Sequence, residues 1–175
     1  MMKIAIVLSL LALYASGAFA RFDYYSVTHS DPPAKCQYEI VVKTASIDNA
    51  GTDAQITVAL SGADGFNKRL EVTDLQSWGR MGENYNYFES GNLDLFGGSG
   101  ECVPSGPCRM MLVSDNSGNK PGWYVSYVKV TQIAPDLSVF SHTFKVDQWL
   151  AVDEPPYQLY ALRDDCDAKH AVAME

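Results

Sequence analysis

The chain has 175 residues, of which 47% are hydrophobic and 19% are charged, and its formal net charge is -8 at pH 7. This length is enough for one domain with a buried core. The abundance of apolar residues excludes a disordered chain. The acidic excess and the lack of a basic cluster exclude nucleic acid as an expected partner, and they disfavour direct attraction to an anionic membrane surface.

Residues 1–20 have the pattern of a secretory signal peptide. Lys3 precedes an uncharged, mostly apolar run over 4–19, which ends in the cleavage motif Ala-Phe-Ala at 18–20. The alternative is an N-terminal membrane anchor, but the run is short for a bilayer, which needs about 20 apolar residues. We therefore expect a protein of the secretory pathway, extracellular or in the endoplasmic reticulum. Without Lys3 its formal net charge becomes -9.

A linker over 21–35, broken by Asp31-Pro32-Pro33, leads into a series of short strands. Alternating apolar residues predict strands over 38–43, 55–60, 70–72, 93–96, 110–113, 125–131, 140–146 and 157–161. We expect a turn over 97–100 and a short helical turn over 147–152. Eight or so short strands at regular spacing predict an all-β, antiparallel sandwich, and Trp123 is expected in its core.

The segment 73–92 places aromatic residues among glycines and asparagines. Trp78, Tyr85, Tyr87 and Phe88 are its aromatic side chains. Such a loop can present aromatic rings to a lipid surface, which makes Trp78, Tyr85 and Tyr87 candidates for lipid contact. The same rings can instead plug one end of the sandwich, and the residues alone leave both interpretations open.

The chain has four cysteines, at 36, 102, 108 and 166. Structural disulfides are favoured over a metal site because C-x-x-C pairs are absent and the three histidines are scattered. Cys102 and Cys108 flank a turn-rich loop that can close on itself. This position predicts a Cys102–Cys108 bond, which leaves Cys36 to pair with Cys166 and to join the two ends of the domain.

The most informative segment is Ser-Asp-Asn-Ser-Gly-Asn-Lys-Pro-Gly-Trp-Tyr over 114–124. It resembles the signature of PLAT/LH2 domains, the C2-like β-sandwiches attached to lipoxygenases and some lipases. Three further segments fit the same family: Ala-Gly-Thr-Asp-Ala over 50–54, Tyr-Asn-Tyr-Phe-Glu-Ser-Gly-Asn-Leu-Asp-Leu-Phe over 85–96, and Gln-Trp-Leu-Ala over 148–151. The second and third are similar to stand-alone, stress-associated PLAT proteins of plants.

This resemblance implies an eight-stranded C2-like sandwich over 36–166, and the residues after it predict a flexible tail over 167–175. It implies a binding role without catalysis, since the enzymes of this family carry their chemistry in other domains. The sequence itself contains no G-x-S-x-G, H-E-x-x-H or P-loop motif. The expected partner is a lipid or membrane surface, or a membrane-associated protein, and we expect a monomer. The alternatives are a purely protein-binding stress factor and a carboxylate-based hydrolase.

Calcium is the cofactor that the resemblance suggests, since loops at one end of such sandwiches supply oxygen ligands. The matching positions are Gly51 through its carbonyl, Asp53, Asp94, Asp115 and Asn116. Each has a structural alternative. Asp53 can cap a turn, Asp94 can accept hydrogen bonds from loop amides, and Asp115 with Asn116 can form an Asx turn.

Overall fold

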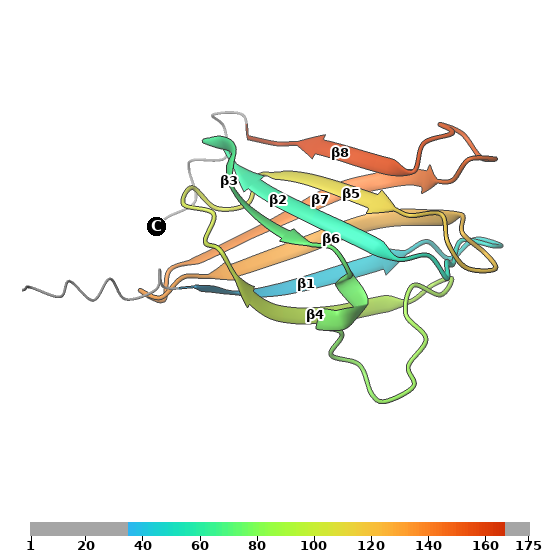
Figure 1. Cartoon of the computed structure of the whole chain (residues 1–175), viewed down its shortest axis with the longest axis horizontal. Helices are drawn as coiled ribbons and strands as arrows, with labels where there is room; N and C mark the ends of the chain where they lie inside the picture. Colours follow the sequence, from blue (N-terminus) through green and yellow to red (C-terminus); the bar gives the residue numbers. More distant parts are fainter. Residues whose placement is uncertain (1–34, 167–175) are drawn as a thin grey trace, which may run out of the picture. The chain divides into compact units, whose positions relative to one another are not determined.

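The computed structural model describes residues 35–166, without the side chains of 66–68, and it contains two four-stranded antiparallel sheets (Figure 1). The strands, in chain order, are β1 Cys36–Thr44, β2 Ile56–Gly62, β3 Gly65–Val72, β4 Leu93–Gly100, β5 Arg109–Ser114, β6 Trp123–Ile133, β7 Val139–Leu150 and β8 Tyr160–Asp164. One 3-10 turn, η1 Leu75–Trp78, follows β3. The predicted all-β, antiparallel sandwich is confirmed.

The first sheet has the strand order β4-β1-β6-β7, and the second has the order β3-β2-β5-β8. β1 shows why these segments form strands, because its buried and accessible residues alternate with the two-residue period of a pleated sheet. Residues from both sheets meet in one hydrophobic core that includes Ile40, Ile56, Leu112 and Phe144, all fully buried. The outer strands leave β3 and β4 as edges on one side, and β7 and β8 on the other.

Two local predictions are wrong. The glycine-rich segment 97–100 is not a turn but the second half of β4, which pairs with β1. Glycine is needed there because a Cβ on Gly98 would lie 2.4 Å from the Trp78 ring, and a Cβ on Gly100 would lie 2.3 Å from Leu70. Sequence reasoning reads consecutive glycines as a turn, whereas here they make room for side chains that cover the strand.

The expected helical turn over 147–152 is also absent, because β7 continues to Leu150. Asp147 has a φ of 45°, and the register with β6 shifts between Val125 and Tyr127. These features describe a β-bulge, in which one strand carries an extra residue opposite its partner. The bulge interrupts the alternation that identifies a strand in a sequence.

The predicted disulfide pairing is wrong as well: Cys36 is bonded to Cys102 and Cys108 to Cys166. Strand register explains the pairing. Cys36 lies opposite Gly100 in the β1–β4 ladder, two residues before Cys102. Likewise Arg109, next to Cys108, lies opposite Asp164, two residues before Cys166. Each bond therefore joins neighbouring strands of one sheet.

The predicted signal peptide over 1–20, nearly all of the linker over 21–35 and the tail over 167–175 lie outside the described residues. Among the residues that the structure describes, no helix has the length and apolar character to cross a bilayer.

The disulfide pairing leads to a first prediction. Digestion without reduction is expected to release one peptide pair linked through Cys36 and Cys102, and another linked through Cys108 and Cys166. Mass spectrometry before and after reduction identifies both pairs. Because the bonds span 66 and 58 residues, removal of either is expected to lower the free energy of unfolding by about 4 kcal/mol. A peptide linked through Cys102 and Cys108 would contradict the register.

A second prediction concerns Trp123, which is fully buried and donates from Nε1 to Thr44 Oγ1 over 2.9 Å. Trp123→Ala should lower the free energy of unfolding by about 3–5 kcal/mol, because it leaves a cavity and an unpaired hydroxyl. Urea unfolding measures the change. Val152→Ala, at a side chain that is 57% exposed, is the control and should change it by no more than about 0.5 kcal/mol. Equal midpoints for both variants would show that Trp123 is not a core residue.

Candidate functional site: the loop end of the sandwich

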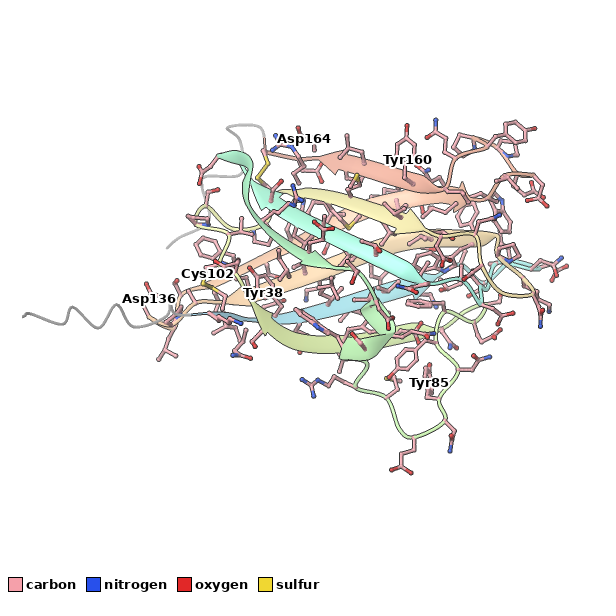
Figure 2. All side chains as sticks on the ribbon, viewed as in Figure 1. Tyr38, Tyr85, Cys102, Asp136, Tyr160 and Asp164 are labelled. Carbon is pink, nitrogen blue, oxygen red and sulfur yellow. A yellow bond between two sulfur atoms is a disulfide. The ribbon has the colours of Figure 1, made fainter. Side chains whose placement is uncertain are left out.

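Three loops, 45–55, 115–122 and 151–159, meet at one end of the sandwich, which we call the loop end. Strand register places them together. In the first sheet Thr44, the last residue of β1, lies opposite Val125 near the start of β6. In the second sheet Ile56 of β2 lies opposite Ser114, the last residue of β5. The opposite end carries the β6–β7 hairpin and both disulfides, as the positions of Asp136 and Cys102 in Figure 2 show.

Hydrogen bonds join the last residues of the 45–55 loop to the 115–122 loop. Asp53 N donates to the carbonyl of Lys120 over 3.1 Å, and Thr52 Oγ1 donates to that of Pro121 over 3.0 Å. Gly118, with a φ of 81°, packs so closely that a Cβ on it would lie 2.5 Å from Asp53 Cβ. The structure therefore brings Asp53 next to the loop that carries Asp115 and Asn116.

Asp115 and Asn116 form the Asx turn that was the alternative to a metal site. Asp115 Oδ1 accepts from Ser117 N over 2.9 Å and from Gln55 N over 3.0 Å, and hydrogen bonds from Ser117 lower the pKa of this exposed carboxyl. Asn116 adopts a left-handed backbone with a φ of 58°. Its Oδ1 atom is buried without a hydrogen-bond partner among the described residues, so one amide oxygen in this loop is left free to accept.

Asp94 has a different environment, because it is fully buried beneath the segment 85–92. Its Oδ2 atom accepts from Phe88 N over 2.8 Å. Burial raises the pKa of Asp94, although the hydrogen bond from Phe88 acts in the opposite direction. Desolvation, followed by the nearby Asp94 carboxyl, raises the pKa of Tyr85 to about 12. Asp94 thus holds this segment through Oδ2, while its Oδ1 atom is buried without a hydrogen-bond partner among the described residues.

The five candidate ligands do not converge on a cluster of acidic side chains. Within residues 35–166, no three His, Cys, Asp or Glu side chains are grouped closely enough to hold a metal ion. Gly51 lies beside a carboxylate that sequence reasoning missed, because a Cβ on Gly51 would be 3.1 Å from Glu89 Oε2. Glu89 is part of the 85–96 motif, but only the folded loop places it next to Gly51.

The aromatic candidates are also separated. Tyr87 accepts a hydrogen bond from Met81 N over 3.0 Å, and its ring packs against Phe96 at 5.1 Å between centroids. Tyr85 packs edge-on against Tyr87 at 4.9 Å, on a loop beside β4 (Figure 2). Trp78 instead lies against Gly98 on β4. Tyr87 and Phe88 therefore fill the end of the sandwich, as the plug interpretation expected.

Sequence reasoning missed a set of accessible apolar side chains at the loop end. Ile47 is 46% exposed, Leu93 51%, Val152 57% and Tyr157 65%. Ile47 and Val152 are single apolar residues near polar or turn-forming residues, where periodicity gives no signal. Leu93 and Tyr157 begin segments that alternation predicted as strands, and alternation does not show that they are exposed. The only available signal was that Val152 and Tyr157 flank the polar and proline-rich segment 153–156.

The match to known families now has a structural context. The family model described as PLAT/LH2 domain matches residues 38–163. The chain belongs to the PLAT/LH2 family. It is 41% identical over 163 residues to PLAT domain-containing protein 1 of Arabidopsis thaliana, which covers 93% of this chain and 83% of that protein. PLAT domain-containing protein 2 of the same plant is 41% identical over 81% of this chain and 76% of its own length.

Larger proteins contain the same fold as one part. The lipoxygenase homology domain-containing protein 1 of Mus musculus is 32% identical over 79% of this chain, but the match covers 6% of that protein. A coral 8R-lipoxygenase, whose structure is described in terms of calcium activation via a C2-like domain, superposes with a TM-score of 0.53. The match has 22% identity and covers 73% of this chain and 16% of the lipoxygenase. This likeness establishes a C2-like fold.

The buried Asp94 leads to a third prediction. A pKa raised by burial means that the protonated carboxyl stabilises the fold, and that this contribution is lost as pH rises through the folded-state pKa. Asp94→Asn keeps an oxygen acceptor for Phe88 N and removes the titration. The wild type should therefore lose stability relative to Asp94→Asn as pH rises from about 3 to 7.

Urea unfolding at several pH values measures this difference. Asp94→Ala is the matched control for the hydrogen bond, since it removes the acceptor of Phe88 N. It should lower the free energy of unfolding by about 1–3 kcal/mol. A difference between wild type and Asp94→Asn that stays constant over this pH range would show that burial does not perturb Asp94.

Proposed function

We propose that this PLAT protein is a non-enzymatic module that binds a lipid membrane surface through its loop end. The main support for this proposal is a set of exposed apolar side chains at that end: Ile47, Leu93, Val152 and Tyr157. They come from the 45–55 loop, the start of β4 and the 151–159 loop, all at this end of the sandwich. Tyr124 and Trp149, which lie opposite each other on β6 and β7 near this end, pack edge-on at 5.4 Å. Full burial of a fully exposed apolar side chain contributes about 1.5–3 kcal/mol, and these side chains begin about half exposed.

The negative charge of the loop end restricts which membranes it can bind without a cation. The loop end carries the acidic residues Asp48, Asp53, Asp115 and Asp153, and the whole chain has a net charge of -8. A surface of anionic lipid repels such a set of charges. The apolar contact therefore favours zwitterionic lipid, unless a cation bridges the carboxylates and the lipid phosphates.

Calcium is the cation that we propose for this bridge, at the paired loops 51–53 and 115–116. Its ligands there would be the Gly51 carbonyl, Asp53, Asp115 and Asn116, while Asp94 remains a structural residue. The buried Asn116 Oδ1 atom without a partner supports this assignment, because a hard cation takes carboxylate and amide oxygens. A bound ion would supply positive charge between the protein and lipid phosphate. Extracellular calcium modules have dissociation constants of about 10⁻⁴–10⁻³ M.

We place this function in the secretory pathway, outside the cell or in the endoplasmic reticulum, and in a plant stress response. The two disulfides support an oxidising compartment, and the relatedness to the Arabidopsis proteins supports a plant setting.

A membrane-associated protein is the second candidate partner. The outer face of the second sheet carries Met111 opposite Leu162 and Val113 opposite Tyr160. Met111, Tyr160 and Leu162 are 37%, 48% and 49% exposed. Adjacent accessible apolar residues on a sheet face are typical of a surface that another protein covers.

Liposome co-sedimentation tests the lipid proposal. Val152→Ser with Tyr157→Ser should weaken binding to phosphatidylcholine vesicles by about ten-fold or more, because both apolar contacts are lost. Leu137→Ser is the matched control, since Leu137 is 79% exposed on the hairpin at the opposite end. Loss of binding in Leu137→Ser alone would move the contact to that end. Absence of wild-type binding to any vesicle would favour the protein partner.

The calcium assignment has its own test on vesicles that contain phosphatidylserine. Binding should require millimolar calcium, and it should be lost in chelator and in Asp53→Asn with Asp115→Asn. Asp94→Asn is the control and should keep calcium-dependent binding. Equal wild-type binding in calcium and in chelator would contradict the calcium assignment without touching the apolar contact.

A further inference from the structure

A solvent-open cleft lies on the side of the sandwich where β3 and β4 form the edges of the two sheets. On the other side, Arg163 of β8 ties the sheets together, since Nε donates to the Lys145 carbonyl and Nη2 to Gln148 Oε1, both over 2.8 Å. On the β3–β4 side, Arg80 after η1 donates from N to the Leu95 carbonyl of β4 over 2.9 Å, and a cavity of about 420 Å³ lies beside this contact. This volume falls within the range of about 300–1,000 Å³ that is typical of ligand pockets.

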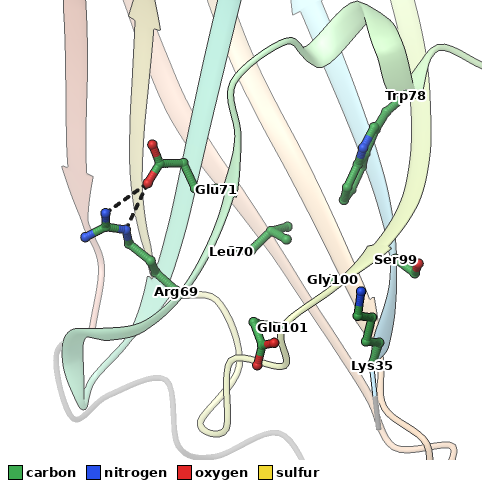
Figure 3. A pocket seen from close by; sticks show the side chains of 8 residues that line it. All are labelled: Lys35, Arg69, Leu70, Glu71, Trp78, Ser99, Gly100 and Glu101. Atoms are coloured by element: carbon green, nitrogen blue, oxygen red, sulfur yellow. Dashed lines mark hydrogen bonds and ion pairs between the residues drawn. The ribbon is translucent and has the colours of Figure 1, made fainter. Parts of the chain in front are cut away.

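Trp78 forms one wall of this cleft (Figure 3). One face of its indole lies flat on β4, because a Cβ on Gly98 would come within 2.4–2.7 Å of three ring atoms. The ring is therefore fixed in orientation, and it is only partly buried. Its Nε1–H donates no hydrogen bond to any residue that the structure describes. The cleft thus has an immobilised aromatic wall with an unused donor at its edge.

The floor and rim of the cleft have a different character. Leu70 forms an apolar floor against Gly100. Around it stand side chains of both charges, which are Lys35, Arg69, Glu71 and Glu101, together with Ser99 (Figure 3). Arg69 Nη2 and Glu71 Oε2 form an ion pair at 2.9 Å. The rim has two cationic and two anionic side chains, so its net charge is zero.

We propose that this cleft binds a neutral glycan, with a sugar ring stacked on Trp78. A pyranose presents a face of C–H groups that suits the negative face of an indole, and its hydroxyls donate and accept around the ring. The rim supplies carboxylate acceptors at Glu71 and Glu101 and cationic donors at Lys35 and Arg69. This site differs from the loop end, so it does not depend on the membrane proposal.

The balance of charge and the geometry favour this ligand class over the others. A hydrocarbon chain in the cleft would desolvate the charged rim without giving it partners. A lone anion or cation would meet two groups of opposite charge and two of like charge, and it would compete with the Arg69–Glu71 ion pair. A neutral polyhydroxyl ligand bonds to both kinds of group, and the open side of the cleft lets a chain of sugars continue into solvent.

Indole N–H resonances in a ¹H–¹⁵N spectrum provide the test, because the chain has only three tryptophans. Trp78→Phe assigns the Trp78 signal by its disappearance. The wild type is then titrated separately with cellohexaose, xylohexaose, mannohexaose and hexa-N-acetylchitohexaose. We expect at least one of these neutral oligosaccharides to shift the Trp78 resonance while the resonance of buried Trp123 stays in place.

Calorimetry with that oligosaccharide then compares variants. Trp78→Ala should weaken binding by about ten-fold or more, and Glu101→Gln should weaken it without touching the aromatic wall. Trp149→Ala is the matched control, since Trp149 is a partly buried indole at the loop end, and its affinity should equal that of the wild type. Thermal melting confirms that each variant is folded. If Trp78→Ala does not fold, the proposal is tested by the affinity of Glu101→Gln and by the shift of the Trp78 resonance in the wild type.

Three outcomes would overturn the proposal. The first is that none of the four oligosaccharides moves the Trp78 resonance. The second is that folded Trp78→Ala and Glu101→Gln bind as tightly as the wild type. The third is that dihexanoylphosphatidylcholine, and no oligosaccharide, moves this resonance, which would assign the cleft to a lipid headgroup. The vesicle experiments with the loop-end variants report on a different surface, so the two proposals can fail independently.

Discussion

The burial of Phe88 is the interaction on which the loop end depends. Its backbone has a φ of 60°, a left-handed conformation that is unfavourable by about 1–2 kcal/mol for a residue other than glycine. The fold maintains it because the ring is fully buried against Trp123 at 4.9 Å and against Phe96 at 5.5 Å. Its N–H bonds to the buried Asp94, and its carbonyl accepts from Thr52 N over 3.2 Å. One residue thus joins the 79–92 segment to the core and to the 45–55 loop.

At the opposite end, a buried polar network has the corresponding role. Tyr38 Oη donates to Gln132 Oε1 over 2.7 Å, and Gln132 exchanges two hydrogen bonds of 3.0 Å with the backbone of Val103. Burial is the main reason that the pKa of Tyr38 is raised to about 12. Satisfied buried groups of this kind specify one arrangement, since every alternative leaves a polar atom unpaired. The network fixes the 101–108 loop beside the Cys36–Cys102 bond.

The two binding surfaces that we propose are the loop end and the cleft at the β3–β4 edges. Each lies where the sandwich is not covered by a further strand of its sheets. At the loop end the chain runs in loops, and single apolar residues such as Val152 and Tyr157 are exposed there. On the β3–β4 side, Arg80 after η1 donates from Nη2 to the Gly97 carbonyl over 2.6 Å, and Trp78 lies there on a strand whose glycines leave room for its ring. The same eight-stranded sandwich therefore carries both the proposed membrane-binding loop end and the proposed glycan-binding cleft, and the two sites share no residue.

Alternation in the sequence was sufficient for the strands, because a half-buried strand repeats every two residues, and the 114–124 motif was sufficient for the family. Alternation also predicted that Trp123 is buried, because an aromatic side chain at the start of an apolar strand usually packs into the core. Local sequence patterns failed where the conformation of a segment depends on contacts with a distant one, as at the glycines of β4 and at the bulge at Asp147.

The disulfide pairing shows the same limit. The cysteine spacing favoured closure of the short 102–108 loop, whereas strand register in each sheet selected the other partners. The candidate ligands were found as residue types, but their roles depended on burial: Asp94 lies inside, and Asp115 remains accessible. Sequence by itself determined the strands, the family and the chemical groups available. Only the tertiary structure decided which groups meet, because contacts between distant segments depend on register and packing that no local pattern records.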